Sequence, residues 1–153
     1  MWITRSKTDE AERLLAIQQE AFACDLRKYE DYDTSPVNEP IDRLRTKINT
    51  FYHYTIWQDS NIIGGIDIRD LGNGKYRLNR IFLLQEYQNK GLGTQIINRV
   101  ESEFPQAVEW YLDTPHLNNR NRHFYEKLGY QQIGEHRLSD KLILIDYKKT
   151  INK

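Results

Sequence analysis

Apolar and polar positions follow two different periods along the chain, and one stretch contains both. Residues 81–84 form a short apolar run of the kind found in buried strands, and residues 88–94 form a polar turn that contains two glycines. After this turn begins, small or apolar residues recur at helical spacing along one face: Gly93, Ile96, Ile97, Val100 and Phe104. The stretch therefore predicts a strand, a glycine turn and the N-terminus of an amphipathic helix.

The same two periods predict the order β-α-α-β-β-β-α-β-α-β-β for the whole chain. The first helix is expected to begin at an N-cap at Thr8 and to fray near Asp25, the second to cover residues 41–48, and the last to end at Gly129. We expect an α/β (α+β) fold with a central mixed seven-stranded sheet, a right-handed β-α-β crossover and helices on both faces. Strands are expected over residues 2–5, 51–57, 62–68, 75–84 and 108–112, from residue 131 onward, and over residues 142–145, an apolar run fit for a sheet interior.

Composition narrows the functional classes. The chain has 153 residues, and we expect a single domain over residues 1–153. Its 22 basic and 22 acidic side chains cancel, which argues against a nucleic-acid partner bound through net charge. The single cysteine, Cys24, cannot form an internal disulfide, and no apolar run suits a signal peptide or a membrane span. We therefore expect a cytoplasmic protein without a membrane partner, as a monomer or a homodimer.

The glycine turn has the features of an anion site. The first turn of a helix carries backbone N–H groups without intrahelical partners, and the helix dipole is positive there. Glycine lets a phosphate approach this backbone, and Lys90 adds a positive charge. Spacing excludes two known patterns: Lys90 precedes Gly91, unlike the lysine of a P-loop, and Ile96 stands where the dinucleotide fingerprint needs a small residue. A phosphate or pyrophosphate site of another kind is expected.

Two motifs carry a resemblance to a known family. Residues 88–93, QNKGLG, fit the pattern Q/R-x-x-G-x-G/A and resemble the pyrophosphate loop of the GNAT superfamily, the acyl-CoA-dependent N-acyltransferases. Residues 118–130, NNRNRHFYEKLGY, are similar to the GNAT pattern N-x-x-A-x-x-F-Y-x-K-x-G-F/Y, although Asn121 stands where alanine is common. The expected order of strands and helices also matches the GNAT fold over nearly the whole chain.

The resemblance implies an N-acetyltransferase that moves acetyl from its cosubstrate acetyl-CoA to a primary amine of a small molecule or protein by direct attack. The backbone N–H of Leu83 would stabilise the oxyanion, and Tyr125 would protonate the departing thiolate. Either Asn118 or Asn121 would meet the pantetheine. No metal is expected, because none of the 4 histidines has a metal-ligand spacing. The implied acetyl-CoA-binding positions are Leu83, Gln88, Asn89, Lys90, Gly91, Leu92, Gly93, Thr94, Asn118 and Asn121.

The general base is left open by the resemblance. Many members place a glutamate on the long strand before the glycine turn, but the candidate positions here hold Arg77, Asn79 and Arg80. The missing carboxylate keeps an alternative open, in which the chain is a non-catalytic module that binds or senses acyl-CoA. The remaining candidates for the base are Asp67, Glu20 and Asp113.

The segment between the first two helices faces the acceptor in proteins of this family. Residues 28–40 carry two prolines, two tyrosines and several carboxylates, and they predict a loop. The side chains of residues 29–33 would suit a cationic acceptor, although their composition by itself shows only a solvated acidic loop. The acceptor amine is therefore not predicted.

Overall fold

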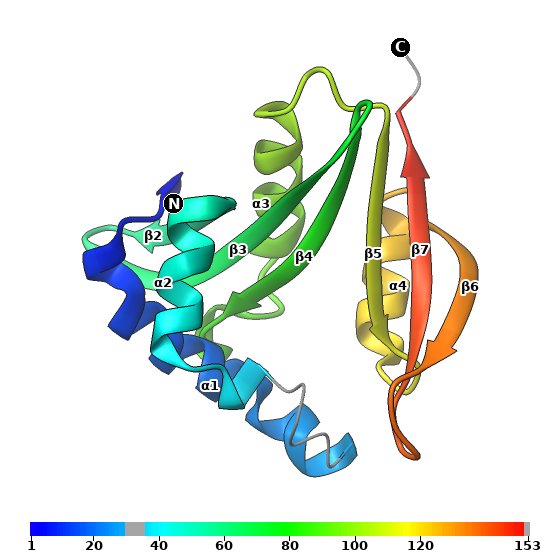
Figure 1. Ribbon diagram of the computed structural model, residues 1–153, viewed down its shortest axis with the longest axis horizontal. Helices are drawn as coiled ribbons and strands as arrows, with labels where there is room; N and C mark the ends of the chain where they lie inside the picture. Colours follow the sequence, from blue (N-terminus) through cyan, green and yellow to red (C-terminus); the bar gives the residue numbers. More distant parts are fainter. Residues whose placement is uncertain (30–35, 152–153) are drawn as a thin grey trace.

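The computed structural model describes residues 1–29 and 36–151, with side chains outside residues 24–29. One seven-stranded sheet runs through it in the order β1-β2-β3-β4-β5-β7-β6 (Figure 1). The strands are β1 (Trp2–Arg5), β2 (Tyr52–Gln58), β3 (Asn61–Gly72), β4 (Lys75–Leu83), β5 (Glu109–Pro115), β6 (Gln131–Arg137) and β7 (Ile143–Thr150). The helices are α1 (Ala11–Tyr29), α2 (Ile41–Thr50), α3 (Leu92–Ser102) and α4 (Asn119–Lys127), with 3-10 turns η1 (Thr8–Glu10), η2 (Pro36–Asn38) and η3 (Gln85–Tyr87).

The predicted order of elements and the mixed sheet are confirmed. Neighbouring strands pair antiparallel except β4 and β5, which are parallel and connected through α3. A parallel pair needs a crossover of this length, and the helical period after the glycine turn is what predicted it.

The start and end of the first helical segment differ from the prediction. Lys7, rather than Thr8, is the N-cap, and its backbone N–H donates to Glu10 Oε1 at 3.0 Å. This bond satisfies the backbone N–H of the N-cap residue, and Thr8 is therefore part of the 3-10 turn instead of capping it. α1 continues to Tyr29 instead of fraying near Asp25, because no glycine or proline interrupts it there.

Strands β3 and β7 are longer than predicted. β3 extends to Gly72 because it pairs with β4 as far as the turn between them. β7 continues beyond the apolar run to Thr150, and the buried side chains of Ile145 and Tyr147 alternate with the half-buried Asp146. This alternation shows that β7 is fully covered on one face only.

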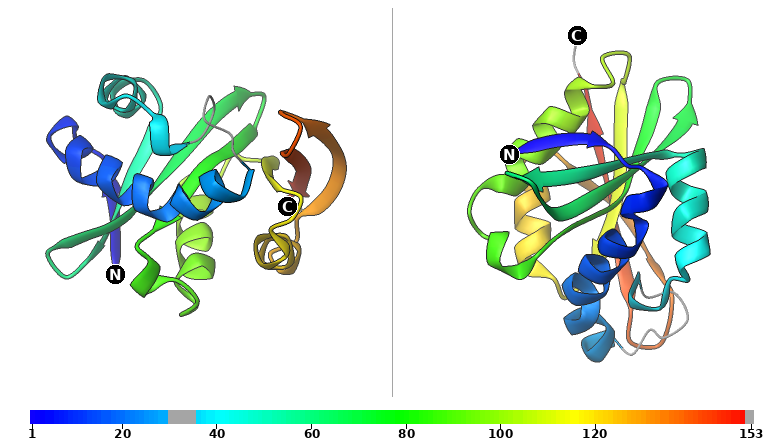
Figure 2. Two further views of the ribbon diagram at one scale, coloured as in Figure 1. Left: turned by 90° about the horizontal axis from the view of Figure 1, so that it is seen from below. Right: turned by 90° about the vertical axis from the view of Figure 1, so that its left-hand side faces the viewer.

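Helices cover the two faces of the sheet unequally. α1 and α2 lie against one face of β2, β3 and β4, and α3 and α4 lie on the opposite face (Figures 1 and 2). On the face that α1 and α2 occupy, no described helix covers β5, β7 and β6 (Figure 1). The predicted loop over residues 28–40 is wrong at its start, where residues 28 and 29 belong to α1, and at residues 36–38, which form η2; its residues 30–35 lie outside the described ones. Within residues 1–29 and 36–151, no helix is long and apolar enough to cross a membrane.

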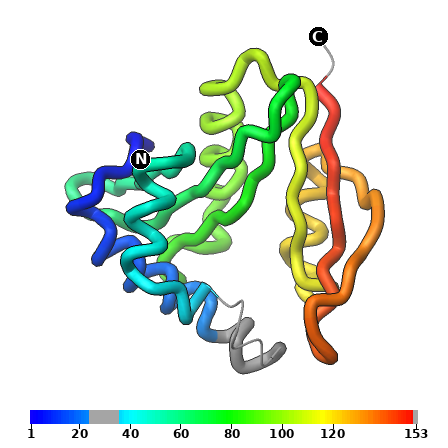
Figure 3. The backbone as a smooth tube through the Cα atoms, in the orientation of Figure 1, coloured from blue at the N-terminus to red at the C-terminus, as the bar shows by residue number. Residues whose placement is uncertain are grey.

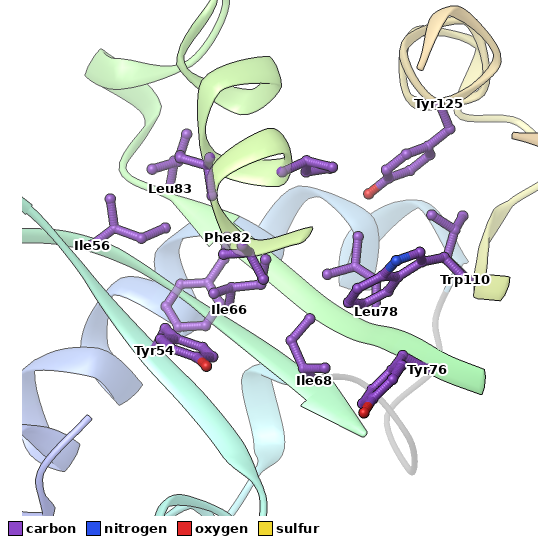
Figure 4. Close-up of a cluster of buried hydrophobic side chains, with 14 of the residues drawn as sticks. Tyr54, Ile56, Ile66, Ile68, Tyr76, Leu78, Phe82, Leu83, Trp110 and Tyr125 are labelled. Atoms are coloured by element: carbon purple, nitrogen blue, oxygen red, sulfur yellow. The ribbon is translucent and has the colours of Figure 1, made fainter. Parts of the chain in front are cut away.

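Three aromatic rings join β4 to β5 under α3. The ring centroid of Tyr76 lies 4.7 Å from that of Phe104 and 5.4 Å from that of Trp110. All three side chains are buried, and Figure 4 shows Tyr76, Leu78 and Trp110 side by side on this face. Because side chains alternate along a strand, Arg77 must point to the opposite, α1–α2 face.

Strands β4 and β5 separate after a short paired segment. Residues 75–77 of β4 pair with residues 109–111 of β5, and beyond them β4 pairs with β3 while β5 pairs with β7. The register of β3 and β4 shifts at Asn79, where a bulge increases the local twist of the strand. Figure 3 shows the two backbones diverging from there on. The far end of β4, around Leu83, therefore has a strand partner on one side only.

Candidate functional site

The end of β4 presents a backbone N–H on its unpaired side. The N–H of Leu84 donates to the carbonyl of Ile63 in β3 at 2.9 Å. Successive N–H groups of a strand point in opposite directions, so the N–H of Leu83 points away from β3, toward the side from which β5 has diverged. The side-chain amide of Gln88 donates to the Leu83 carbonyl on that side at 2.9 Å, which ties the following turn to the strand.

The two glycines of the turn have different tasks. Gly91 is the N-cap of α3 with φ 77°, a left-handed conformation that favours glycine, and nothing would contact a Cβ there. Gly93 has an ordinary backbone, but a Cβ on it would lie 3.0 Å from the ring of Phe124 in α4. Gly91 thus leaves the N-terminus of α3 open, whereas Gly93 allows α4 to pack against α3.

Positive charge gathers around this helix N-terminus. Lys90, Gly91 and Thr94 are exposed, and the first N–H groups of α3 have no intrahelical partners. Arg120 of α4 reaches across, with Nη1 3.3 Å from Asn89 Oδ1 and Nη2 3.4 Å from Gln88 Oε1. The helix dipole, the ammonium and the guanidinium together suit a phosphate or pyrophosphate group.

Tyr125 lies on the same face of the sheet as α3. Its side chain is 6% exposed, and its ring packs against Phe124 and Tyr130 with centroids 5.1 and 5.9 Å away. Figure 4 shows the ring projecting from α4, with the hydroxyl toward the region between α3 and β4. Within the part of the chain that the structure describes, this hydroxyl has no hydrogen-bond partner. Burial, and to a smaller extent the Asp113 carboxylate, raises the pKa of Tyr125, so the phenol stays protonated and can donate.

The structure distinguishes the two asparagines of the second motif. Asn118 is the N-cap of α4, and its Oδ1 accepts from the backbone N–H of Asn121 at 3.0 Å. Its side-chain oxygen therefore serves the helix. The half-buried Asn121 lies in the first turn of α4, where alanine is common in the pattern.

Two buried carboxylates between the sheet and α2 are already paired. Asp67 is 2% exposed and accepts hydrogen bonds from Asn79 Nδ2 at 2.9 Å and from Arg69 Nη2 at 3.2 Å. Glu39, which sequence reasoning missed, lies at the start of α2 and binds Lys47 and Arg80. We call Glu39, Lys47, Arg80 and Gln18 the Glu39 cluster, since Gln18 Nε2 also donates to Glu39 at 3.1 Å.

Charge pairing decides the state of Glu39. Burial alone would raise the pKa of the Glu39 carboxyl. The hydrogen bonds from Lys47 and Gln18 and the charge of Arg80 outweigh that effect and hold its pKa below the ordinary value. Glu39 is therefore a charged structural carboxylate. Of the carboxylates considered from sequence, Glu20 is exposed on α1, away from these contacts.

A second group of titratable side chains lies on the face of the sheet that no described helix covers. Asp113 of β5, His136 of β6 and Asp146 of β7 each offer one ligand-type atom within 4.8 Å of the other two. His136 Nδ1 lies 3.0 Å from Asp146 Oδ2, and the guanidinium of Arg77 binds Asp113. We call Asp113, His136 and Asp146 the Asp113 cluster. A depression of about 180 Å³ adjoins it, lined by Arg77, Tyr111, Leu112, Ile133, Gly134, Asp146 and Tyr147.

The spacing of the Asp113 cluster would also suit a divalent cation. Two carboxylates and an imidazole form a common donor set. The guanidinium of Arg77, however, already occupies one oxygen of Asp113 and would repel such an ion. We therefore assign no metal to these residues. Sequence spacing did not reveal the cluster, because its members come from three strands that only the sheet order brings together.

A family model for the acetyltransferase (GNAT) domain matches residues 49–132 of the chain. The chain belongs to the GNAT acetyltransferase family. The matched region runs from the end of α2 through the glycine turn and Tyr125 to the start of β6, so it contains both motifs. The resemblance drawn from the two motifs is confirmed.

One protein is similar to this chain in sequence, and several solved structures share its fold. The uncharacterized protein YrkN of Bacillus subtilis (strain 168) is 28% identical over an alignment of 121 residues, and the match covers 75% of this chain and 64% of the length of YrkN. Two solved structures share the fold over nearly the full chain. One is PaiA N-acetyltransferase from Thermoplasma acidophilum in complex with coenzyme A, with a TM-score of 0.78, 18% identity and coverage of 98% of both chains. The other is the ribosomal-protein-S18-alanine N-acetyltransferase of Escherichia coli, with a TM-score of 0.79, 15% identity and coverage of 99% of this chain and 94% of that one.

A third structural neighbour was solved with acetyl-CoA. YncA of Salmonella typhimurium, solved with acetyl-CoA, has a TM-score of 0.76 and 11% identity, and the match covers 100% of this chain and 95% of that one. At such identities these neighbours show that the fold is shared.

Proposed function

We propose that this chain is an N-acetyltransferase that moves the acetyl group of acetyl-CoA to a primary amine by direct attack. The observation that carries the proposal is the divergence of β4 from β5, which leaves the N–H of Leu83 without a strand partner. The hydroxyl of Tyr125, which has no hydrogen-bond partner among the described residues, points toward the region between α3 and β4. Neighbours with bound CoA or acetyl-CoA support the choice of cosubstrate. We also propose that residues 1–153 form one acetyltransferase domain, because one sheet includes strands from both ends of the chain.

In this proposal acetyl-CoA lies along the unpaired edge of β4. Its pyrophosphate binds the first N–H groups of α3, within residues 88–94, where Lys90 and Arg120 add positive charge. Its pantetheine passes Asn121, because the Asn118 oxygen is engaged in capping α4. The thioester oxygen accepts from the N–H of Leu83, which stabilises the negative charge that develops on attack.

The reaction then needs two proton movements. The amine nitrogen forms its bond to the carbonyl carbon, and the carbon–sulfur bond breaks. Tyr125 donates its hydroxyl proton to the departing CoA thiolate, and a proton from the nitrogen restores the phenol. The products are the amide and the free CoA thiol.

Release of free CoA thiol over a panel of amines tests this proposal, with mass spectrometry of the products as the check on acetylation. We expect release that depends on the amine. Tight binding of acetyl-CoA without amine-dependent release over a broad panel would instead identify the chain as a module that only binds acyl-CoA. This non-catalytic function is favoured by one observation: β4 carries Arg77, Asn79 and Arg80, and none of them is a carboxylate that could act as the base.

A further inference from the structure

Asp113 occupies a particular place in the sheet. The pairing of β4 with β5 ends at Arg77 and Tyr111, and Asp113 is the next residue of β5 on the same face as Tyr111. The alternate residues of β5, Trp110 and Leu112, are buried on the opposite face. The Asp113 carboxylate therefore stands where the two strands begin to diverge, on the face opposite α3 and α4.

The same carboxylate is electrostatically close to Tyr125, which lies on the other side of the sheet. Its negative charge contributes to the raised pKa of the phenol. Two groups that approach one point from opposite faces can act on the two ends of one reaction: a phenol near the leaving thiolate and a carboxylate near the entering amine.

Asp113 also differs from the other carboxylates near the diverging strands, because it is more exposed and fewer of its oxygen atoms are already bound. Asp67 and the side chain of Glu39 are 2% and 4% exposed and have cations or amides at both oxygens. The side chain of Asp113 is 21% exposed, and its bound guanidinium contacts only Oδ2. Exposure rises along the cluster, to 29% for the side chain of Asp146 and 45% for that of His136. The cluster leads from the diverging strands to solvent.

We propose that Asp113 accepts the proton of the acceptor ammonium and that the His136–Asp146 pair passes this proton to solvent. This inference rests on the proposed acetyltransferase function and names the general base that the sequence left open. An acceptor ammonium carries three protons, and the amide keeps one. The first proton goes to Asp113 before the nitrogen attacks, and then through His136 to water. The second leaves after attack and balances the proton that Tyr125 gives to the thiolate.

The residues around Asp113 have defined parts in this step. Arg77 is a positioning residue, because its guanidinium holds Oδ2 and leaves Oδ1 for the amine. An imidazole accepts and releases protons near neutral pH, and Asp146 orients the ring of His136 through Nδ1. The adjoining depression of about 180 Å³ gives the acceptor an approach along Tyr111 and Gly134.

The test compares two amines of nearly the same shape, ethylamine and trifluoroethylamine, as acceptors for acetyl-CoA. Ethylamine is an ammonium at the assay pH and needs a base, whereas trifluoroethylamine is already neutral. We expect Asp113→Asn to lower thiol release about 100-fold with ethylamine and only about 3-fold with trifluoroethylamine. An equal loss with both amines, or no loss, would overturn the role of Asp113. No amine-dependent release from the wild-type protein would overturn the acetyltransferase function itself, and this inference with it.

Two further variants keep the test independent of the folding of Asp113→Asn. His136→Gln changes an exposed ring, and we expect it to slow only the ethylamine reaction, by about 10-fold, with recovery when imidazole is added as an external proton carrier. Failure of imidazole to restore the rate would remove His136 from the path. The matched control is Glu109→Gln, on the same strand and face, where Glu109 binds Tyr111 and Lys148. It should leave the ratio of the two amine rates unchanged.

Discussion

The Glu39 cluster and the Asp113 cluster lie on the same face of one sheet, and they differ in how completely their charges are paired. Glu39 lies under α2 with a side chain only 4% exposed, and it meets two cations and an amide. The Asp113 cluster lies where no described helix covers the sheet. Each of its two carboxylates has one partner: Asp113 binds the guanidinium of Arg77, and Asp146 binds the imidazole of His136. Burial of a charge thus does not by itself indicate catalysis. The catalytic role that we propose for Asp113 depends instead on a bonding position left open beside solvent, and variants of the two clusters can test this difference.

The largest effect on stability is expected from Glu39→Gln. The change leaves Lys47 and Arg80, whose side chains are 13% and 18% exposed, without their counter-charge. We expect the free energy of unfolding, measured with urea, to fall by about 3 kcal/mol. Acetyl-CoA affinity at low temperature should stay unchanged.

Asp146→Asn is the matched change in the other cluster. Asp146 and His136 are partly exposed, so the free energy of unfolding should change by less than about 1 kcal/mol. If Asp146→Asn destabilised the protein as much as Glu39→Gln, the contrast between a structural and a functional cluster would be wrong.

Tyr125→Phe should affect turnover and leave stability nearly unchanged. The hydroxyl has no hydrogen-bond partner among the described residues, so its removal leaves no buried polar group of these residues without a hydrogen bond. We expect kcat to fall about 100-fold, because the thiolate then leaves without a proton, while the acetyl-CoA dissociation constant stays within about 2-fold. Single-turnover kinetics and calorimetric titration measure the two quantities separately. Unchanged kcat would refute the acid role.

His53 supplies a pH dependence of stability near the Glu39 cluster. Burial lowers the pKa of His53 to about 4, against the opposing charge of Asp67. Between the ordinary histidine value of about 6.5 and this lowered pKa, the unfolded chain binds a proton that the folded chain does not, so stability falls as pH falls. We expect a loss on the order of 3 kcal/mol between pH 7 and pH 4, measured by urea unfolding. His53→Gln should show a clearly shallower loss over the same range.

The smallest effect is expected at the helix N-terminus. Gly91 has φ 77°, so Gly91→Ala should cost about 1 kcal/mol of stability and reduce acetyl-CoA affinity modestly. Gly134 has no positive φ and nothing within 4 Å of a Cβ, so Gly134→Ala serves as the control and should be neutral or slightly stabilising. Thermal unfolding measures the change in stability of both variants. If Gly91→Ala and Gly134→Ala changed stability equally, a side chain would not strain the left-handed conformation at residue 91.

Local periodicity was enough to predict the order of strands and helices and the parallel crossover. The apolar run before residue 84, the glycine turn and the helical spacing from Gly93 to Phe104 define a strand, a crossover and the parallel pair of β4 and β5. Motif spacing also identified the family. These features depend on residues close in sequence, where side-chain period and backbone geometry are linked directly.

The charged clusters could not be predicted in the same way. A strand pattern tells which residues share a face, but not which strands become neighbours. Asp113, His136 and Asp146 meet only because β7 lies between β5 and β6, and Glu39 meets Arg80 only because α2 lies over β4. The ion pair of Arg77 with Asp113 likewise depends on where β4 and β5 stop pairing. Such long-range facts decide which carboxylate is available for chemistry.

The position of β7 has a consequence for how the protein matures during synthesis. Strands β5 and β6 do not pair with each other, and β7, which follows both of them in the chain, is inserted between them. A nascent chain that has emerged only as far as β6 can pair β1 to β5, but β6 has no strand to pair with until β7 emerges. The nascent protein would thus complete its glycine turn before the Asp113 cluster is assembled.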